Sequence, residues 1–488
     1  MFLSASLVLL LLGTFLPPGI AGTGTLVAAQ AVLLIGFIAE RHVTAVGAFL
    51  FMSFLFFGMR PLYLVIEGDT DLLVGLFRTG DSLEIRHVAL AWAAAGLWLL
   101  AAGCHVQRQL GGWQISSLLK HSARPMLTAR YALLRPQAYR AALVIQGVAL
   151  ALIMVISTGG RGIYSSGLGA YVWDIPMVLQ GLQLFGVAVA AERWRTQRTT
   201  QGRNSLGLAL AMLTLTAWYA RDVTLFRGAY ITPLMAAGFC LMFRFKGRVS
   251  YAWLILPIVL LLPIFRTLGQ NRNVGNVEFG SVVMNKIADA LSPSSYWTFF
   301  EAGGDINIFD TFIAAIQYEP VYKPYILSWI YPPFHIIPRA IWSGKPDAGI
   351  LQDLSYTNGA PYSPGLVGFF WGDGGPLWML GSMFVLGGLL SWVDMKVLRL
   401  APGYLKICTY AIVVVNALYL TRFFLWQSLW QTFYFLVPCW LIARYVVRQR
   451  TGPPTGSPIM PLSRPASGDR LRQSNNQARR RGRGQAGR

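Results

Sequence analysis

Charged residues are scarce in this chain. Asp, Glu, Lys and Arg make up only 12% of its 488 residues, whereas the hydrophobic types make up 55%. Soluble domains carry about 25% charged residues, so this composition excludes an ordinary soluble core. Apolar runs near the bilayer-crossing length of about 20 residues recur, for example at Leu206 to Ala220, Tyr251 to Phe265 with its flanks, and Val367 to Val393. Lipid offers no partners to backbone groups, so these runs are predicted to be helices.

Cysteine and histidine are also rare. The four cysteines, Cys104, Cys240, Cys408 and Cys439, fall in or beside apolar runs without paired spacing, which favours buried free thiols over a disulfide framework. With only five histidines and no Cys/His cluster, a zinc site is not expected. The chain also lacks the GxxxxGK(S/T), HExxH and GxSxG motifs. We therefore predict no metal and no cofactor.

The net charge of +21 is unevenly distributed, and its distribution argues against nucleic-acid binding. Most of the basic residues, but few of the acidic ones, lie in alternate connections between apolar runs: Gln107 to Arg140, Glu192 to Asn204, Arg244 to Arg248, Asp394 to Lys406, and the tail after Arg444. The positive-inside rule places these connections in the cytoplasm. Both termini are then cytoplasmic, and the first apolar run, Met1 to Pro17, is expected to be a retained helix because no basic region or cleavage site accompanies it.

The pattern predicts an all-α polytopic membrane protein. We expect about twelve transmembrane helices, starting near residues 3, 23, 43, 87, 141, 174, 205, 228, 250, 366, 405 and 423. Residues 1–265 would hold helices one to nine, with a basic cytoplasmic loop at 105–140, and residues 366–446 would hold helices ten to twelve. Residues 266–365 would form one large periplasmic loop. The tail, residues 447–488, is rich in Pro, Ser, Gly and Arg and is predicted to be disordered.

The large loop carries most of the chemically interesting residues. A connection of that length is either disordered or functional, and its many Trp and Tyr residues favour order. Basic side chains suited to binding phosphate are predicted on the outer side, as are acids and a histidine that could activate a hydroxyl group. The candidate binding residues are Arg161, Arg221, Arg266, Arg272, Arg339 and Lys345; the candidate catalytic residues are Glu301, Asp305, Asp310 and His335. The alternative interpretation is that the acids only balance nearby basic groups.

The segment IIPRAIWSGKPDAG, followed by GLVGFFWGDGGPLWMLGSMFVLGG, resembles the Wzy-type polymerases of oligosaccharide repeat units, which make O-antigen and exopolysaccharide. The family pattern falls on Pro338, Arg339, Lys345 and Pro346, then on Gly368, Gly372, Gly374 and Gly375. Members often carry a glutamate after the first of these glycines. This chain has Phe369 and Phe370 there, and Asp373 is the nearest acid.

The resemblance implies glycosyl transfer between two undecaprenyl-pyrophosphate-linked oligosaccharides on the periplasmic face of the bacterial inner membrane. Arg339, Lys345, Arg266 and Arg272 would neutralise the departing diphosphate. Asp310, Glu301, Asp305 and His335 are the candidate bases, and Asp222 is a further option. Membrane lipid, a chain-length regulator and other polysaccharide assembly proteins would be partners.

Three alternatives stay open at this point. An O-antigen-type ligase shares the many-helix plan and the large outer loop, and His335 with Arg339 suits it. A transporter or flippase would move the lipid-linked sugar without forming a bond, but it commonly shows internal repeats, and none is seen here. A membrane scaffold would tolerate neutralisation of the outer basic residues.

Overall fold

The structure is a computed structural model. It describes residues 1–68, 83–112, 136–158, 174–224, 228–260, 296, 299–300, 308–317, 329, 342, 363–400, 404–422 and 425–446. The tail at 447–488, which is predicted to be disordered, lies outside the described residues, and the described residues all belong to one compact unit. The packing described below is within this unit.

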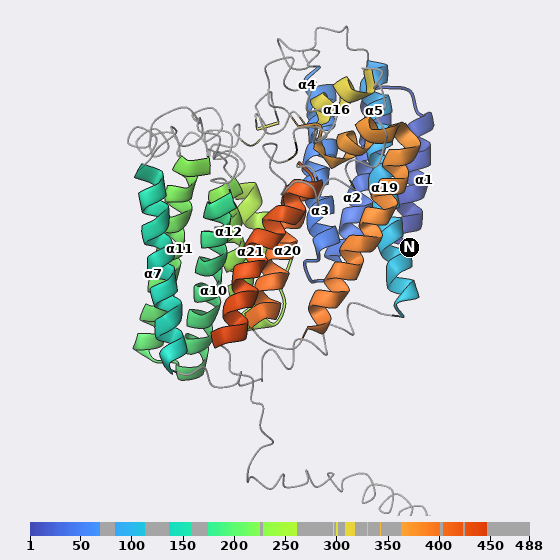
Figure 1. Ribbon diagram of the computed structural model, residues 1–488. Helices are drawn as coiled ribbons and strands as arrows, with labels where there is room; N and C mark the ends of the chain where they lie inside the picture. The colour runs from blue at the N-terminus through green and yellow to red at the C-terminus, as the bar shows by residue number, and fades with distance from the viewer. Residues whose placement is uncertain are drawn as a thin grey trace, which may run out of the picture. The chain divides into compact units, whose positions relative to one another are not determined.

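Regular structure in these residues is helical throughout, with no β-strand (Figure 1). The elements are α1 (Phe2–Phe15), α2 (Ile20–Ile38), α3 (Ala45–Phe54), the π-helical turn η1 (Leu55–Met59), α4 (Arg60–Glu67), α5 (Leu83–Leu110), α7 (Pro136–Thr158), α10 (Asp174–Gln197), α11 (Thr200–Thr224), α12 (Gly228–Lys246), a helix at 252–260, α16 (Ile308–Gln317), α19 (Gly365–Arg399), α20 (Tyr404–Leu420) and α21 (Leu425–Val446). A helix begins within a few residues of every start predicted from the sequence.

Six of the described helical segments are long and apolar enough to cross a membrane: Ile20–Ile38, Ala45–Glu67, Leu83–Leu110, Tyr139–Thr158, Ile175–Arg195 and Gly365–Arg399. The second of these segments combines α3, η1 and α4. These findings support an all-α membrane protein. The figure of about twelve spans, the sidedness of the termini and the extent of the periplasmic loop stay predictions.

Close backbone contact joins α5 to α19, which run side by side in Figure 1. A Cβ atom built on Gly387 would lie 1.9 Å from the carbonyl oxygen of Leu100, and one built on Gly103 would lie 2.0 Å from that of Phe384. Without a hydrophobic driving force between helices in lipid, small residues allow the close packing that holds helices together. The two glycines therefore set the separation of this helix pair.

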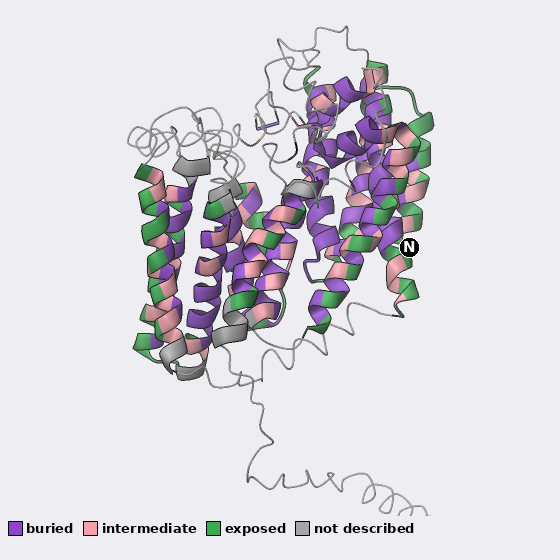
Figure 2. Cartoon of the chain, in the orientation of Figure 1, coloured by how far each residue is buried: buried purple, intermediate pink, exposed green. Residues whose placement is uncertain are grey.

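A second group of contacts involves α7, α10, α11, α12, α20 and α21. The Gln146 side chain on α7 donates to the Gln183 carbonyl on α10 at 3.0 Å, and the Gln183 side chain donates back to the Gln146 carbonyl at 2.7 Å. Both glutamines are fully buried. In Figure 2 the buried faces of α10 are purple, whereas α7 shows many exposed residues, as expected for a helix with a lipid-facing side.

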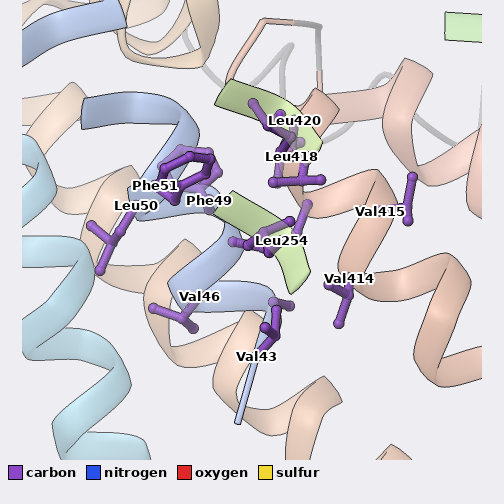
Figure 3. Packing of buried hydrophobic residues seen from close by; sticks show 14 of the residues in the cluster. Val43, Val46, Phe49, Leu50, Phe51, Leu254, Val414, Val415, Leu418 and Leu420 are labelled. Atoms are coloured by element: carbon purple, nitrogen blue, oxygen red, sulfur yellow. The ribbon is translucent and has the colours of Figure 1, made fainter. Parts of the chain in front are cut away.

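The core between these two groups comes from α3, the helix at 252–260 and α20. Figure 3 shows some of the side chains that meet there, among them Phe49 of α3, Leu254 of the helix at 252–260, and Leu418 of α20. All are nearly inaccessible to solvent. The four cysteines are buried and free, as predicted. The side chain of Cys408 lies in contact with those of Cys240 and Cys439, so the fold brings together three thiols that are far apart in sequence.

Candidate functional site at the base of the predicted outer loop

An arginine lies deep in an otherwise apolar segment. Arg60 is the first residue of α4 and directly follows the π-helical turn η1. The segment Ala45–Glu67 is apolar enough to cross a membrane, and the Arg60 side chain is completely buried. A π-helical turn widens the backbone spiral and is frequent at functional sites. A buried charge in such a segment needs a partner.

The partner of Arg60 is Asp310, near the start of α16, from the segment predicted to form the outer loop. Arg60 Nη2 lies 2.7 Å from Asp310 Oδ2, and Arg60 Nε donates to Oδ1 at 3.3 Å. A third donor, Nη1, binds the carbonyl oxygen of Phe300. The two-pronged contact uses the planar fork of the guanidinium group. One arginine thus holds two separate parts of the predicted loop.

Aromatic rings near these two residues in sequence pack against one another. Phe57 of η1 meets Phe309 and Phe312 of α16 edge to face, at centroid distances of 6.5 and 5.9 Å. All three side chains are buried, and α16 packs against α5, η1 and α19. Both charges are withdrawn from solvent, which makes the pair costly to form and more costly to break on one side only.

Two further contacts fix neighbouring parts of the chain. Trp329, from the predicted loop, binds α19, and the start of α19 binds the residue that follows α20. Trp329 Nε1 donates to Ser382 Oγ of α19 at 3.1 Å, and its ring stacks on Phe370 with centroids 5.6 Å apart. At the start of α19, the Leu366 amide donates to the Thr421 carbonyl at 3.1 Å. Gly365 has a φ of +67°, and a Cβ there would lie 2.7 Å from the same carbonyl oxygen, so this close approach requires glycine.

The glycine-rich stretch that carries the resemblance lies inside α19, where it breaks the helix. Gly374 and Gly375 have non-helical torsion angles, and Pro376 follows them. Gly375 has a φ of +75°, a conformation that glycine adopts without strain. Phe369, Phe370, Trp371 and Asp373, immediately before the break, are all buried.

A second group of buried polar residues lies at the helix ends that are predicted to face the cytoplasm. Both carboxylate oxygens of Asp394, on α19, accept the Ala45 amide at 3.0 Å, at the first residue of α3. The Tyr410 hydroxyl donates to the Val43 carbonyl at 2.8 Å. His42 Nδ1 accepts the Val249 amide at 3.3 Å. These bonds join the start of α3 to α19, α20 and the residues after α12.

Burial shifts the pKa values of two groups in the turn between α2 and α3. For His42, burial, helped by the positive charge of Arg248, lowers the pKa to about 3. For Glu40, burial raises the pKa, although the Arg108 guanidinium that it contacts acts in the opposite direction. His42 therefore stays neutral in the folded protein at physiological pH.

Of the residues predicted to be catalytic or to bind substrate, only Asp310 has a described side chain. Arg221 falls within α11, but its side chain lies outside the described part of the structure. The remaining predicted residues also lie outside it: Glu301, Asp305, His335, Arg161, Arg266, Arg272, Arg339 and Lys345. Their roles stay predictions.

Sequence reasoning missed Arg60 and the break in α19. The signal for Arg60 was present, because a single arginine inside an apolar span is a functional candidate by default. The signal for the break was the Gly-Gly-Pro sequence at 374–376, which frees backbone groups in the middle of a helix. Neither signal predicts which other residues lie against Arg60 or against the break in the fold.

Asp310 accepts from two nitrogens of a buried arginine. A carboxylate held in this way is suited to fixing a chain segment. Among the described residues, no group of three His, Cys, Asp or Glu side chains could hold a metal ion. Comparison with family models, curated proteins and solved structures finds no match to this chain.

Proposed function

We propose that this protein is a polysaccharide polymerase of the bacterial inner membrane. It joins undecaprenyl-pyrophosphate-linked oligosaccharide repeat units by glycosyl transfer on the periplasmic face. The proposal rests on the resemblance around Pro338 to Gly388 and on one structural observation. Arg60 anchors Phe300 and Asp310, which precede this resemblance in the predicted outer loop, to the membrane helices.

The anchor supports the proposal for a physical reason. A transferase of this kind must hold two lipid-linked substrates at the membrane surface, and catalysis gains from fixing reacting groups in place. The segment 266–364 supplies the basic residues suited to a diphosphate. A buried ion pair and the Trp329 contacts fix parts of that segment against α4, α5 and α19, which limits how far the catalytic residues would move.

The reaction assigns these roles. A base, taken from Glu301, Asp305 or His335, accepts the proton of an acceptor sugar hydroxyl group. The hydroxyl oxygen attacks the anomeric carbon of the donor sugar, and the bond from that carbon to the diphosphate oxygen breaks. Undecaprenyl pyrophosphate leaves with the bonding electrons. Arg339, Lys345, Arg266 and Arg272 stabilise the charge that develops on it, while Asp310 positions the segment through Arg60.

Complementation of a gene deletion tests the proposal. The deletion strain should accumulate single repeat units on the lipid carrier, and the wild-type gene should restore long polymer. Arg339→Ala and Lys345→Ala should fail to restore it. The matched control is Arg203→Ala, which removes an exposed basic residue at the start of α11 and should behave as wild type.

The other outcomes separate the alternatives. Long polymer that persists in the deletion strain contradicts the proposal. Full-length polymer retained on the lipid carrier identifies a ligase instead. Single units trapped on the cytoplasmic side identify a flippase. Normal polymer from both the Arg339 and the Lys345 variants fits a scaffold.

A further inference from the structure

An exposed lysine and an exposed tryptophan lie together at the helix ends that are predicted to face the cytoplasm. Lys246 is the last residue of α12, and its Nζ lies 5.1 Å from the centroid of the Trp253 ring. Gly247, with a φ of +68°, turns the chain from α12 towards the helix at 252–260. Trp253 is 45% exposed. Because the face of an indole ring attracts a cation, Lys246 is held beside the start of the next helix.

An apolar stripe continues from Trp253 along the same helix. Leu256 and Leu260 are 57% and 47% exposed, and steps of three and four residues place them on one helix face with Trp253. This helix belongs to the apolar run Tyr251 to Phe265, which is predicted to cross the membrane. In a bilayer the stripe would contact acyl chains, and tryptophan at its end would lie at the level of the lipid headgroups.

The end of α10 extends this surface. Trp194 is 36% exposed and meets Phe245 edge to face, with centroids 5.2 Å apart. The amide of Arg198 donates to the Trp194 carbonyl at 2.8 Å, and Phe245 directly precedes Lys246. Arg198, Lys246 and Arg248 are all exposed. We call these three cations, together with Trp194 and Trp253, the basic surface.

The acids near the basic surface are paired with other residues. Within ten residues of its three cations in sequence there is one acid, Glu192, which is buried in an ion pair with Arg244. The turn between α2 and α3 is bonded to Val249, and its acid, Glu40, is paired with Arg108. The exposed charge of the basic surface is therefore positive and suits a negatively charged partner.

The position of these charges distinguishes a lipid from an acidic protein. The cation of Lys246 lies at the polar end of an exposed apolar stripe. One molecule that contacts both must carry negative charge beside long hydrocarbon chains, and an anionic phospholipid has this form. Basic side chains at the cytoplasmic ends of membrane helices bind such headgroups. An acidic protein domain would complement the charge and leave the stripe without a match.

We propose that the basic surface binds the phosphate of an anionic phospholipid in the leaflet that is predicted to be cytoplasmic. Lys246 and Arg198 contact the phosphate group, and the two indole rings flank the headgroup. The acyl chains lie along the stripe of Trp253, Leu256 and Leu260. This surface lies at the helix ends opposite the predicted outer loop, so the inference does not depend on the proposed function.

Photo-cross-linking locates the lipid on the full-length protein. The protein is placed in nanodiscs of phosphatidylcholine that contain a small fraction of phosphatidylglycerol with a photoactivatable acyl chain. Mass spectrometry should find the label on the peptide that contains Trp253 and Leu256. Unlabelled phosphatidylglycerol should compete with the probe, whereas added phosphatidylcholine should not. No label between 246 and 260, or equal competition by the two lipids, overturns the proposal.

Variants test which charge recognises the headgroup. Lys246→Gln should require about five times more probe for half-maximal labelling of this peptide, because one basic side chain near an anionic membrane surface has an effect of that size. Lys246→Arg keeps the charge and should behave as wild type. The matched control is Arg140→Gln, which removes an exposed cation at the start of α7, on the same predicted side, and should also behave as wild type.

Four results would contradict the inference. The first two are unchanged labelling in Lys246→Gln and an equal loss in Lys246→Arg. The third is an equal loss in Arg140→Gln, which would show a general effect of charge. The fourth is an acidic protein, recovered from native membranes on this surface in place of the label. If Lys246→Gln lowers the thermal unfolding midpoint, Arg198→Gln replaces it, with the same fivefold effect expected. Added sodium chloride should weaken labelling in the wild type, since salt screens exposed charges.

Discussion

Arg60 Nη2 and Asp310 Oδ2 lie 2.7 Å apart, with both side chains completely buried, although 250 positions separate the residues in sequence. The same guanidinium group binds the Phe300 carbonyl. The pair therefore connects a membrane-embedded helix to the segment that we predict to lie outside the membrane.

Breaking one side of this pair should destabilise the protein. Arg60→Ala leaves the Asp310 carboxylate buried without its cation, and the loss of one partner from a buried pair costs about 3–5 kcal/mol. We expect a clear fall in the thermal unfolding midpoint of the protein in detergent micelles. A midpoint unchanged by Arg60→Ala would show that the pair does not hold the segment.

Replacing both charges separates stability from positioning. In Arg60→Met/Asp310→Leu, apolar side chains of similar volume fill the site, and such exchanges are often neutral for stability. The thermal unfolding midpoint should recover most of the loss seen in Arg60→Ala. Polymer formation should stay impaired, since the two-pronged contact and the bond to Phe300 are lost. Full activity of this variant would contradict the positioning role.

The contact between α5 and α19 predicts a large effect from a single methyl group. In Gly387→Ala the new Cβ would lie 1.9 Å from the Leu100 carbonyl oxygen, so the two helices must separate. We expect a destabilisation of about 1–3 kcal/mol, as for overpacked cores. The control is Gly381→Ala on the same helix, where nothing lies within 4 Å of the new atom and the helix should gain up to about 1 kcal/mol. Chemical unfolding in micelles compares the two.

The lowered pKa of His42 makes the stability of the folded protein depend on pH. Its pKa is about 3 in the folded protein and 6.5 ordinarily, so between these values the unfolded state binds a proton that the folded state does not. The free energy of unfolding should therefore fall as the pH drops below 6.5, approaching about 1.4 kcal/mol per pH unit. Above pH 6.5 this contribution is constant. His42→Asn keeps an acceptor without titrating, and thermal unfolding of this variant should depend less on pH in that range.

Asp394 caps α3 from another helix, because both of its oxygens accept the Ala45 amide at 3.0 Å. Loss of a capping oxygen costs about 0.5–2 kcal/mol, so Asp394→Ala should lower the thermal unfolding midpoint. Asp394→Asn retains an oxygen acceptor and should be the milder change. Equal effects of the two substitutions would show that the hydrogen bond contributes little.

The positions of the helices could be predicted because lipid imposes a strong local rule. Each backbone amide must be paired within its own segment, so apolar runs such as Leu206 to Ala220 become helices wherever they occur. The same rule placed a helix near residue 365. It could not predict the break at Gly374 and Gly375, since a helix break at this depth survives only when neighbours such as Trp378 and Trp329 surround it.

The sequence could predict which residue types the candidate site contains, but it could not predict which of these residues contact each other. Asp310 was selected as a candidate base on a long loop, with charge balance as the alternative, but its partner, Arg60, comes from the second segment long enough to span the membrane. Ion pairs between distant segments depend on how helices pack, and no local pattern encodes that packing.

The sequence by itself determined that this is an all-α membrane protein. Charged residues are scarce, and apolar runs of bilayer-crossing length recur, which a membrane accommodates as helices. The charge asymmetry between alternate connections favoured one orientation. Only the tertiary structure decided that Arg60 meets Asp310, that Cys408 meets Cys240 and Cys439, and that Trp329 contacts α19 on both sides of its break. Those contacts depend on helix separation and register, which small residues such as Gly103 and Gly387 set through backbone contact across helices.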